Sequence, residues 1–172
     1  DYDIVLATST GALPAWMARK YPEVERVDYE GRRHKFGQRH NACPNSEVFR
    51  KYSVALAAKL AERYASNPHV KCWHVSNEYG GTCYCENCEK AFRIWLRKKY
   101  GTLDAVNKAW NTEFWGHTFY DWEEIVAPNS LSEGLWDERS AFAGLSIDYK
   151  RFNSDSMLQN YMDERDALRK YD

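Results

Sequence analysis

The chain has 172 residues, of which 24 are Lys or Arg and 25 are Asp or Glu, so the formal net charge is −1. Apolar residues make up 44% and charged residues 28%, the balance of a folded globular protein rather than a disordered one. The nearly neutral charge argues against a general nucleic-acid or anionic-membrane binder, which would carry an excess of basic residues. No apolar run is long enough for a membrane span, and the first residues lack the basic segment of a secretory signal.

Aromatic residues are unusually frequent, with seven Trp, twelve Tyr and seven Phe, or 15% of the chain. Aromatic rings bind the faces of sugars, but they are also simply large core residues. Composition therefore favours a core role for most of these rings. The high aromatic content is compatible with carbohydrate chemistry but does not establish it.

The first elements predicted are a strand, a short helix and a long connection. Residues 4–8 form an apolar, β-branched run that predicts a buried strand. Residues 12–21 are compatible with a short helix that Pro22 closes. Residues 23–45 are polar and lack strong periodicity, and a connection of that length tends to be functional.

A helix and a second strand follow. Apolar residues recur every four positions after Ser46, a plausible N-cap, until Asn67 and Pro68 end the helix. Residues 70–76 predict a second strand, which runs into an abrupt turn at residues 77–81. Cys72, inside this strand, is expected to be a small buried hydrophobe.

The remaining residues predict mainly helices. One helix carries Cys88 and ends at Gly101, and residues 103–110 suggest a further segment. Residues 111–146 are expected to be irregular, and a last helix is expected over 155–170.

Strands alternating with helices predict an α/β fold with parallel connections. Two strands cannot bury themselves, and a closed (β/α)₈ barrel needs about 250 residues. The length therefore indicates either an unusually covered small sheet or part of a larger enzyme.

The sharpest local feature is Asn77-Glu78, directly after the second predicted strand. In α/β barrels, catalytic groups lie at the carboxyl ends of the strands, where the loops converge. A Glu leaving a buried strand into a cleft is expected to be partly desolvated, as suits a general acid. Taken alone, this segment is better explained as a hydrophilic turn, since carboxylates after strands are common.

Four of the five cysteines have the spacing of metal ligands. Cys83, Cys85 and Cys88 form a CxCxxC pattern, and Cys43 lies forty residues upstream of Cys83. Three thiolates within six residues can reach one tetrahedral centre, and a fourth would complete a closed, structural Cys₄ zinc site. The spacing favours a metal site over scattered free thiols, and disulfides and an iron–sulfur cluster are lesser alternatives. The odd number of cysteines favours a reducing compartment, hence a cytoplasmic location.

A basic loop precedes Cys43. Arg39, four residues before a candidate metal ligand, would be held on a rigid loop and could donate hydrogen bonds to a sugar hydroxyl or a carboxylate. For Arg32, Arg33 and Lys35 a solvated basic loop is the favoured interpretation.

Several of these motifs together resemble glycoside hydrolase family 42, the β-galactosidases built on (β/α)₈ barrels. The similar stretches, which cover nearly the whole chain in the family's order, are residues 7–16, 36–40, 43–46, 73–80, 83–88, 92–96, 100–103, 110–112, 114–115 and 148–152. The resemblance implies that residues 1–172 are a fragment of the catalytic barrel domain without an internal boundary. The fragment would run from about the third barrel strand to the helix after the fourth, as a partial TIM barrel with a zinc-pinned loop region.

The resemblance also implies roles for individual residues. Glu78 matches the general acid/base, Asn77 the asparagine that binds the sugar 2-hydroxyl, and Arg39 an arginine that contacts the same sugar. The family's structural Zn²⁺ site is matched by Cys43, Cys83, Cys85 and Cys88. The family's nucleophile is a second Glu at the seventh strand, which has no counterpart here, so we expect the 172-residue chain alone to be inactive.

The resemblance implies a retaining hydrolase that removes terminal β-D-galactose from β-galactosides such as lactose and galacto-oligosaccharides. It further implies a full-length homo-oligomer, a trimer, with no nucleic-acid or membrane partner. Two alternatives stay open from the residues: a zinc-stabilised nucleic-acid module using the basic loop, and a sugar-binding module without catalysis.

Overall fold

The computed structural model describes residues 2–131, 134–135, 139–140 and 142–172. The chain divides into two compact units. Unit 1 comprises Asp1–Glu25, Lys35–Gly81 and Asp155–Asp172, and unit 2 comprises Arg26–His34 and Thr82–Ser154. The expectation that residues 1–172 belong to one barrel domain without an internal boundary stays a prediction.

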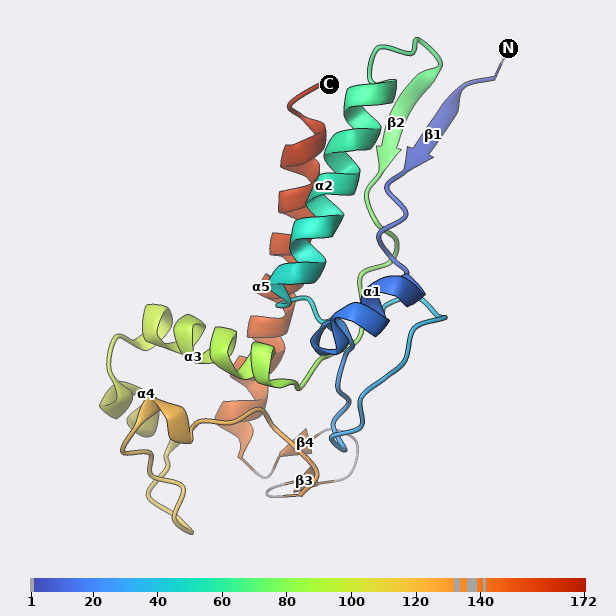
Figure 1. Ribbon diagram of the computed structural model, residues 1–172. Helices are drawn as coiled ribbons and strands as arrows, with labels where there is room; N and C mark the ends of the chain where they lie inside the picture. Colours follow the sequence, from blue (N-terminus) through green and yellow to red (C-terminus); the bar gives the residue numbers. More distant parts are fainter. Residues whose placement is uncertain (1, 132–133, 136–138, 141) are drawn as a thin grey trace. The chain divides into compact units, whose positions relative to one another are not determined.

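Unit 1 contains a parallel strand–helix–strand arrangement (Figure 1). Strand β1 (Ile4–Ala7) pairs in parallel with β2 (Val70–His74), with Leu6 opposite Trp73 and Ala7 opposite His74. Between the strands come α1 (Ala15–Lys20), the 3₁₀ turn η1 (Pro22–Val24) and α2 (Glu47–Tyr64). The predicted strands, the two helices and the α/β class are confirmed. The expectation that the first strand is buried is wrong for this chain, since Ile4 and Val5 are 41% and 64% exposed.

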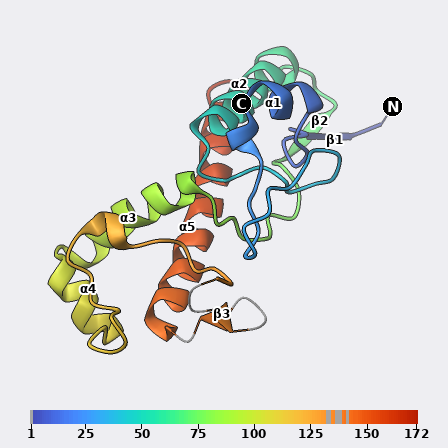
Figure 2. The same cartoon turned by 60° about the horizontal axis from the view of Figure 1, so that its bottom comes forward.

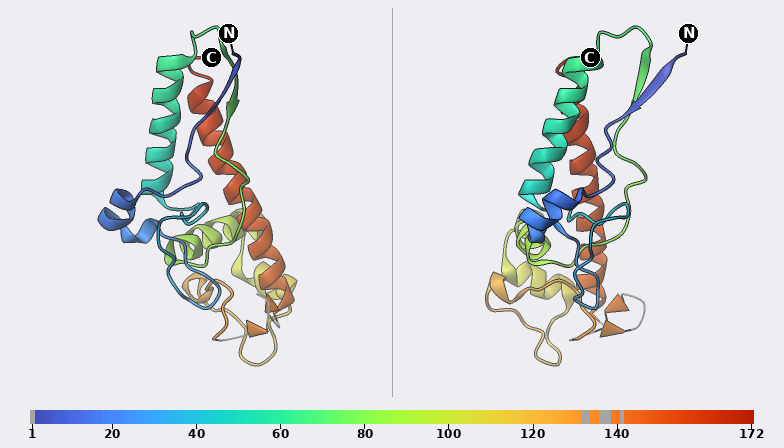
Figure 3. Two further views of the ribbon diagram at one scale, coloured as in Figure 1. Left: turned by 90° about the vertical axis from the view of Figure 1, so that its right-hand side faces the viewer. Right: turned by 45° about the vertical axis from the view of Figure 1, so that its right-hand side comes forward.

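Helix α2 begins where its sequence predicts, because the Ser46 side chain accepts a hydrogen bond from the Phe49 backbone N–H at 3.2 Å. Ala57 and Ala61 of α2 form a buried cluster with Ala167 and Leu168 near the end of the last helix. Figure 3 shows these two helical segments running alongside each other within unit 1. Small residues at the contact allow the helix backbones to approach closely.

One face of β2 is packed against other side chains, and the other face is exposed. Trp73 and Val75 pack against the alanine cluster of unit 1, whereas Cys72 is exposed. The expectation that Cys72 is buried is therefore wrong. Successive side chains of a strand point to opposite faces. Because Trp73 and Val75 lie on the packed face, Cys72 lies on the exposed one.

Unit 2 is mainly helical (Figure 2). Helix α3 (Glu86–Tyr100) ends at Gly101, whose φ of +78° suits glycine, and α4 (Leu103–Trp110) begins at its cap Thr102. The 3₁₀ turn η2 (Trp122–Glu124) and a short antiparallel pair, β3 (Gly134–Leu135) with β4 (Arg139–Ser140), follow.

The core of unit 2 is aromatic. Phe92 packs edge-on against Tyr149 with ring centroids 4.9 Å apart, and it also contacts Trp110 at 6.2 Å and Phe152 at 5.3 Å. All four side chains are buried. The composition therefore predicted correctly that rings serve as core residues, at least for these four.

The last helix is longer than the sequence suggested. Helix α5 spans Ala143–Leu168, so it begins twelve residues before the expected start at Asp155. Leu145, Tyr149 and Phe152 are all buried and recur at three- or four-residue spacing along this first part. Burial of that stripe in unit 2 outweighs the low helix propensity of Gly144 and Ser146.

No helix among the residues the structure describes is long and apolar enough to cross a bilayer.

Candidate active site and metal centre

The candidate active site lies where β1 and β2 end in unit 1. Because the strands are parallel and their last residues, Ala7 and His74, lie opposite each other, the segments that follow them leave the sheet at the same edge. The Thr8 N–H donates to the His74 carbonyl at 3.0 Å, and the Ser76 N–H donates to the Thr8 hydroxyl oxygen at 2.8 Å. These two bonds tie the turn that carries Asn77 and Glu78 to the end of β1.

The backbone at this edge adopts an unfavourable conformation at three residues with side chains. Ser9, Ser76 and Glu78 have φ values of +59°, +55° and +39°. Such residues persist only where surrounding contacts fix them, and they concentrate at functional sites. Gly11 lies against the same turn, since a Cβ built on it would be 3.6 Å from the Asn77 Cβ.

Two of the predicted site residues contact each other directly. Arg39 Nη1 lies 2.6 Å from Glu78 Oε2. The loop carrying Arg39 is held to the loop after β1 by a bridge between Ala12 and Arg39 and by the His40 N–H, which donates to the Gly11 carbonyl at 2.8 Å. Arg39, Asn77 and Glu78 are therefore grouped at one edge of unit 1.

The expected burial of Glu78 is not found in this chain, where its side chain is 68% exposed. The reason is geometric: the carboxylate extends past the edge of a sheet that has only two strands. Arg39, at 61% exposure, is similarly open to solvent.

A carboxylate that the sequence did not single out lies beneath this edge. Glu164 of α5 is only 2% exposed, and it accepts hydrogen bonds from the hydroxyls of Thr8 at 2.9 Å and Thr10 at 2.8 Å. Burial raises the pKa of Glu164, although the hydrogen bonds from Thr10 and Thr8 oppose that shift. Burial and the adjacent Glu164 also raise the pKa of Tyr79, directly after Glu78.

The cysteines form the candidate metal centre. Cys83, Cys85 and Cys88 belong to unit 2, are at most 2% exposed, and place their sulfur atoms within 4.8 Å of one another. Two thiolates on a tetrahedral zinc, each with a Zn–S bond of about 2.3 Å, would be about 3.8 Å apart. The separation of 3.9 Å between the Cys85 and Cys88 sulfurs fits that geometry.

The fourth cysteine of the motif, Cys43, belongs to unit 1, where it is fully buried and its N–H donates to the Val24 carbonyl at 2.7 Å. Together the four buried cysteines offer one sulfur each, a donor set that could hold a metal ion. All five cysteines are in the described part of the chain, and none of them is joined in a disulfide. The disulfide alternative is therefore not supported.

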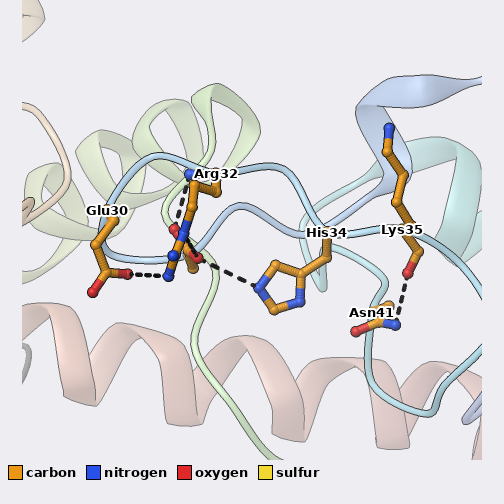
Figure 4. Close-up of polar contacts among 6 residues, drawn as sticks. Glu30, Arg32, His34, Lys35 and Asn41 are labelled. Carbon is orange, nitrogen blue, oxygen red and sulfur yellow. Dashed lines mark hydrogen bonds and ion pairs between the residues drawn. The ribbon is translucent and has the colours of Figure 1, made fainter.

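The basic loop is largely neutralised by neighbouring acids. Arg32 pairs with Asp28 at 2.8 Å and with Glu30 at 3.1 Å, and His34 lies 3.8 Å from Asp28 (Figure 4). Within the same unit, Arg33 contacts Glu86 at 3.5 Å.

Lys35, which belongs to unit 1, lies 3.8 Å from Glu25, and its backbone carbonyl accepts a hydrogen bond from Asn41 (Figure 4). A phosphate-binding surface needs basic groups that are available to a polyanion. The pairing of Arg32, Arg33 and Lys35 therefore weighs against the nucleic-acid alternative.

Comparison with known proteins identifies the class. The β-galactosidase model of glycosyl hydrolase family 42 matches residues 1–172. The chain is 64% identical over 166 residues to β-galactosidase BgaP of Planococcus sp. (strain L4), covering 96% of this chain and 25% of that protein. It is 53% identical over 174 residues to β-galactosidase LacZ of Lactobacillus acidophilus, covering 100% of this chain and 26% of that protein.

Comparison with solved structures points to the same family. The β-galactosidase from Bacillus circulans sp. alkalophilus matches with a TM-score of 0.95 and 64% identity, over 98% of this chain and 25% of that one. Gan42B, a family 42 β-galactosidase from G. stearothermophilus, matches with a TM-score of 0.91 and 45% identity, over 98% and 24%. The chain therefore belongs to glycoside hydrolase family 42, the β-galactosidase family. It spans about a quarter of the length of these relatives.

Proposed function

We propose that this chain carries the acid/base half of the active site of a retaining β-galactosidase. The substrates would be β-galactosides such as lactose and galacto-oligosaccharides, from which terminal β-D-galactose is removed. The observation that carries the proposal is the position of Glu78, directly after a parallel strand and in contact with Arg39 at 2.6 Å, in a member of family 42.

The chemistry follows from the residue types. A retaining glycosidase uses two carboxyl groups about 5–5.5 Å apart, one as acid and then base, the other as nucleophile. Glu78 would donate its proton to the leaving glycosidic oxygen and later take a proton from the water that hydrolyses the glycosyl-enzyme. Asn77 would hydrogen-bond the sugar 2-hydroxyl, and Arg39 would contact the same sugar while holding Glu78 in place.

The nucleophile would come from a part of the full-length enzyme beyond these 172 residues. In the same way, β1 and β2 would be the third and fourth strands of a (β/α)₈ barrel. The parallel pairing of β1 with β2 supports this assignment. Ile4 and Val5 of β1, which are apolar yet 41% and 64% exposed, would be covered by the rest of such a barrel.

We also propose a structural zinc ion bound by Cys83, Cys85 and Cys88, with Cys43 as its fourth ligand. Four thiolates leave no open coordination position, so the ion would stabilise the loop after Glu78 and take no part in hydrolysis. The sulfur spacing within unit 2 supports the proposal. Elemental analysis should find about one zinc per chain, which Cys85→Ser abolishes and Cys72→Ser at the exposed thiol leaves unchanged.

The family resemblance further suggests a homotrimer in the cytoplasm. A chain with five cysteines, four of them suited to a metal, is well matched to a reducing compartment. Sedimentation of the full-length protein would test the trimer.

The experiment that tests the acid/base role compares Glu78→Gln with Glu62→Gln in the full-length enzyme. Glu62 is a matched control, since it is a surface carboxylate paired with Lys59 on α2. Loss of a general acid should reduce kcat/KM on lactose by about 10²–10⁴-fold, with a smaller loss of kcat/KM on a dinitrophenyl galactoside, whose leaving group needs no protonation. Full activity of Glu78→Gln on lactose would refute the proposal. The isolated 172-residue chain should show no turnover.

A further inference from the structure

Glu164 is a buried acid to which the proposed reaction assigns no task. It lies on α5, 156 residues after Thr8 in the sequence, and yet its carboxylate accepts hydrogen bonds from Thr8 and Thr10 at the end of β1. The two threonine side chains are buried as well. Glu164 therefore anchors the segment that leaves β1.

The same hydrogen bonds extend to the turn that carries Glu78. The Thr8 hydroxyl donates its proton to Glu164 Oε2 and accepts the Ser76 backbone N–H at 2.8 Å. Ser76 is two residues before Glu78. A continuous path thus runs from the Glu164 carboxylate through one hydroxyl to the backbone of the turn.

We propose that Glu164 is a positioning residue for the acid/base Glu78, acting through Thr8 and the Ser76 backbone. The inference rests on the proposed function of Glu78. Glu164 touches neither Glu78 nor substrate in this assignment, so its effect is on the geometry of proton transfer.

The conformation of the turn explains why such an anchor is needed. Ser76 and Glu78 both have positive φ, which side chains other than glycine disfavour. Left alone, the turn would relax and swing the Glu78 carboxylate away from its working position. A general acid needs its proton within hydrogen-bond reach of the leaving oxygen, so a small displacement suppresses protonation.

The chemistry of Glu164 suits this task better than a neutral side chain would. An ionised carboxylate is an acceptor only, and it can accept from both threonine hydroxyls at once. That leaves the Thr8 oxygen oriented to accept the Ser76 N–H. The hydrogen bonds that the structure shows for the Glu164 carboxylate come from neutral hydroxyls. Stability alone does not account for a buried carboxylate in such surroundings.

The test measures kcat and KM of Glu164→Gln in the full-length enzyme on two substrates. Lactose needs protonation of its leaving group, whereas a dinitrophenyl galactoside does not. We expect kcat/KM on lactose to fall about tenfold and kcat/KM on the aryl galactoside to fall by less than about twofold. The ratio kcat/KM reports the first step alone, so it leaves out the hydrolysis of the glycosyl-enzyme, in which Glu78 acts as base with both substrates. Asp166→Asn, a change at an exposed neighbour on the same helix, should alter neither value.

A second pair of variants keeps the test decisive if Glu164→Gln folds poorly. Thr8→Val removes the hydroxyl that links Glu164 to Ser76 and should show the same selective loss on lactose, and Thr8→Ser should restore activity. Equal losses on both substrates, or no loss on either, would overturn the inference. If Glu78→Gln is inactive on lactose while these variants show no selectivity, only the positioning role fails. If Glu78→Gln is fully active, the proposed function fails first.

Discussion

A deeply buried carboxylate lies in each unit of the chain, Asp148 in unit 2 and Glu164 in unit 1, and these two carboxylates have opposite surroundings. Asp148 in unit 2 and Glu164 in unit 1 are both 2% exposed. Asp148 pairs with Lys99, accepts hydrogen bonds from Tyr100 at 2.6 Å and Trp110 at 3.0 Å, and lies 3.3 Å from Arg151. The hydrogen bonds found for Glu164 come instead from neutral hydroxyls.

Burial alone would raise the pKa of both acids, yet their pKa values shift in opposite directions. Lys99, Tyr100 and Trp110 together outweigh the effect of burial and lower the pKa of Asp148. For Glu164 the effect of burial prevails, and its pKa is raised. The difference shows that the partners determine whether a buried acid stabilises a fold. In unit 2, Asp148 serves as a structural anchor. In unit 1, Glu164 lies beneath the strained turn of the candidate active site.

The largest effect is expected from removing the proposed metal. Structural zinc contributes about 10 kcal/mol or more to the folding of small zinc domains, so chelation should strongly destabilise the segment around α3. Hydrogen exchange of the full-length protein should show lost protection in α3 after metal removal, while the β1–β2 pairing is affected less. Unchanged exchange throughout α3 after verified metal removal would contradict a structural role.

A smaller but still large effect is expected from removing the cation beside Asp148. Within the described part of the chain, Lys99→Met leaves the buried Asp148 carboxylate with Arg151 as its remaining basic partner, and loss of one partner of a buried pair costs about 3 kcal/mol. The midpoint of urea denaturation should shift accordingly. Lys98→Met, at the exposed neighbouring position, is the control and should change stability by less than about 0.5 kcal/mol. Equal effects of the two variants would show that Asp148 needs no cation.

The smallest effect is expected in the pH dependence of the unfolding free energy. Glu164 and Asp148 should change this free energy in opposite directions as the pH rises. The pKa of Glu164 is above its ordinary value of 4.5 in the folded chain. Its stabilising contribution is therefore fully present at lower pH and is lost as the pH rises through the folded pKa. The pKa of Asp148 is below its ordinary value of 3.8, so its contribution is lost as the pH falls through that lower pKa.

Unfolding free energies measured from pH 3 to pH 8 check this difference. Relative to Glu164→Gln, the parent protein should lose stability with rising pH. Relative to Asp148→Asn, it should lose stability with falling pH. If the stability difference from the parent changed with pH in the same direction for both variants, the two carboxylates would not differ as proposed.

Much of the local structure could be predicted because its causes are local. Ser46 caps α2 through a bond to a residue three positions later, and Gly101 ends α3 because its own φ is positive. Asn77 and Glu78 stand out because they directly follow a recognisable strand. The start of α5 was missed, since its buried stripe becomes visible only when the aromatic core of unit 2 is known.

The sequence by itself determined the α/β class, both strands, most helices, the cysteine pattern and the family. Only the tertiary structure decided that Arg39 lies 2.6 Å from Glu78 and that Glu164 lies beneath the same turn. Local patterns arise from hydrogen bonds and side-chain periods that span a few residues. The bond between Thr8 and Glu164 joins residues 156 positions apart, and its energy depends on burial that no short stretch of sequence encodes.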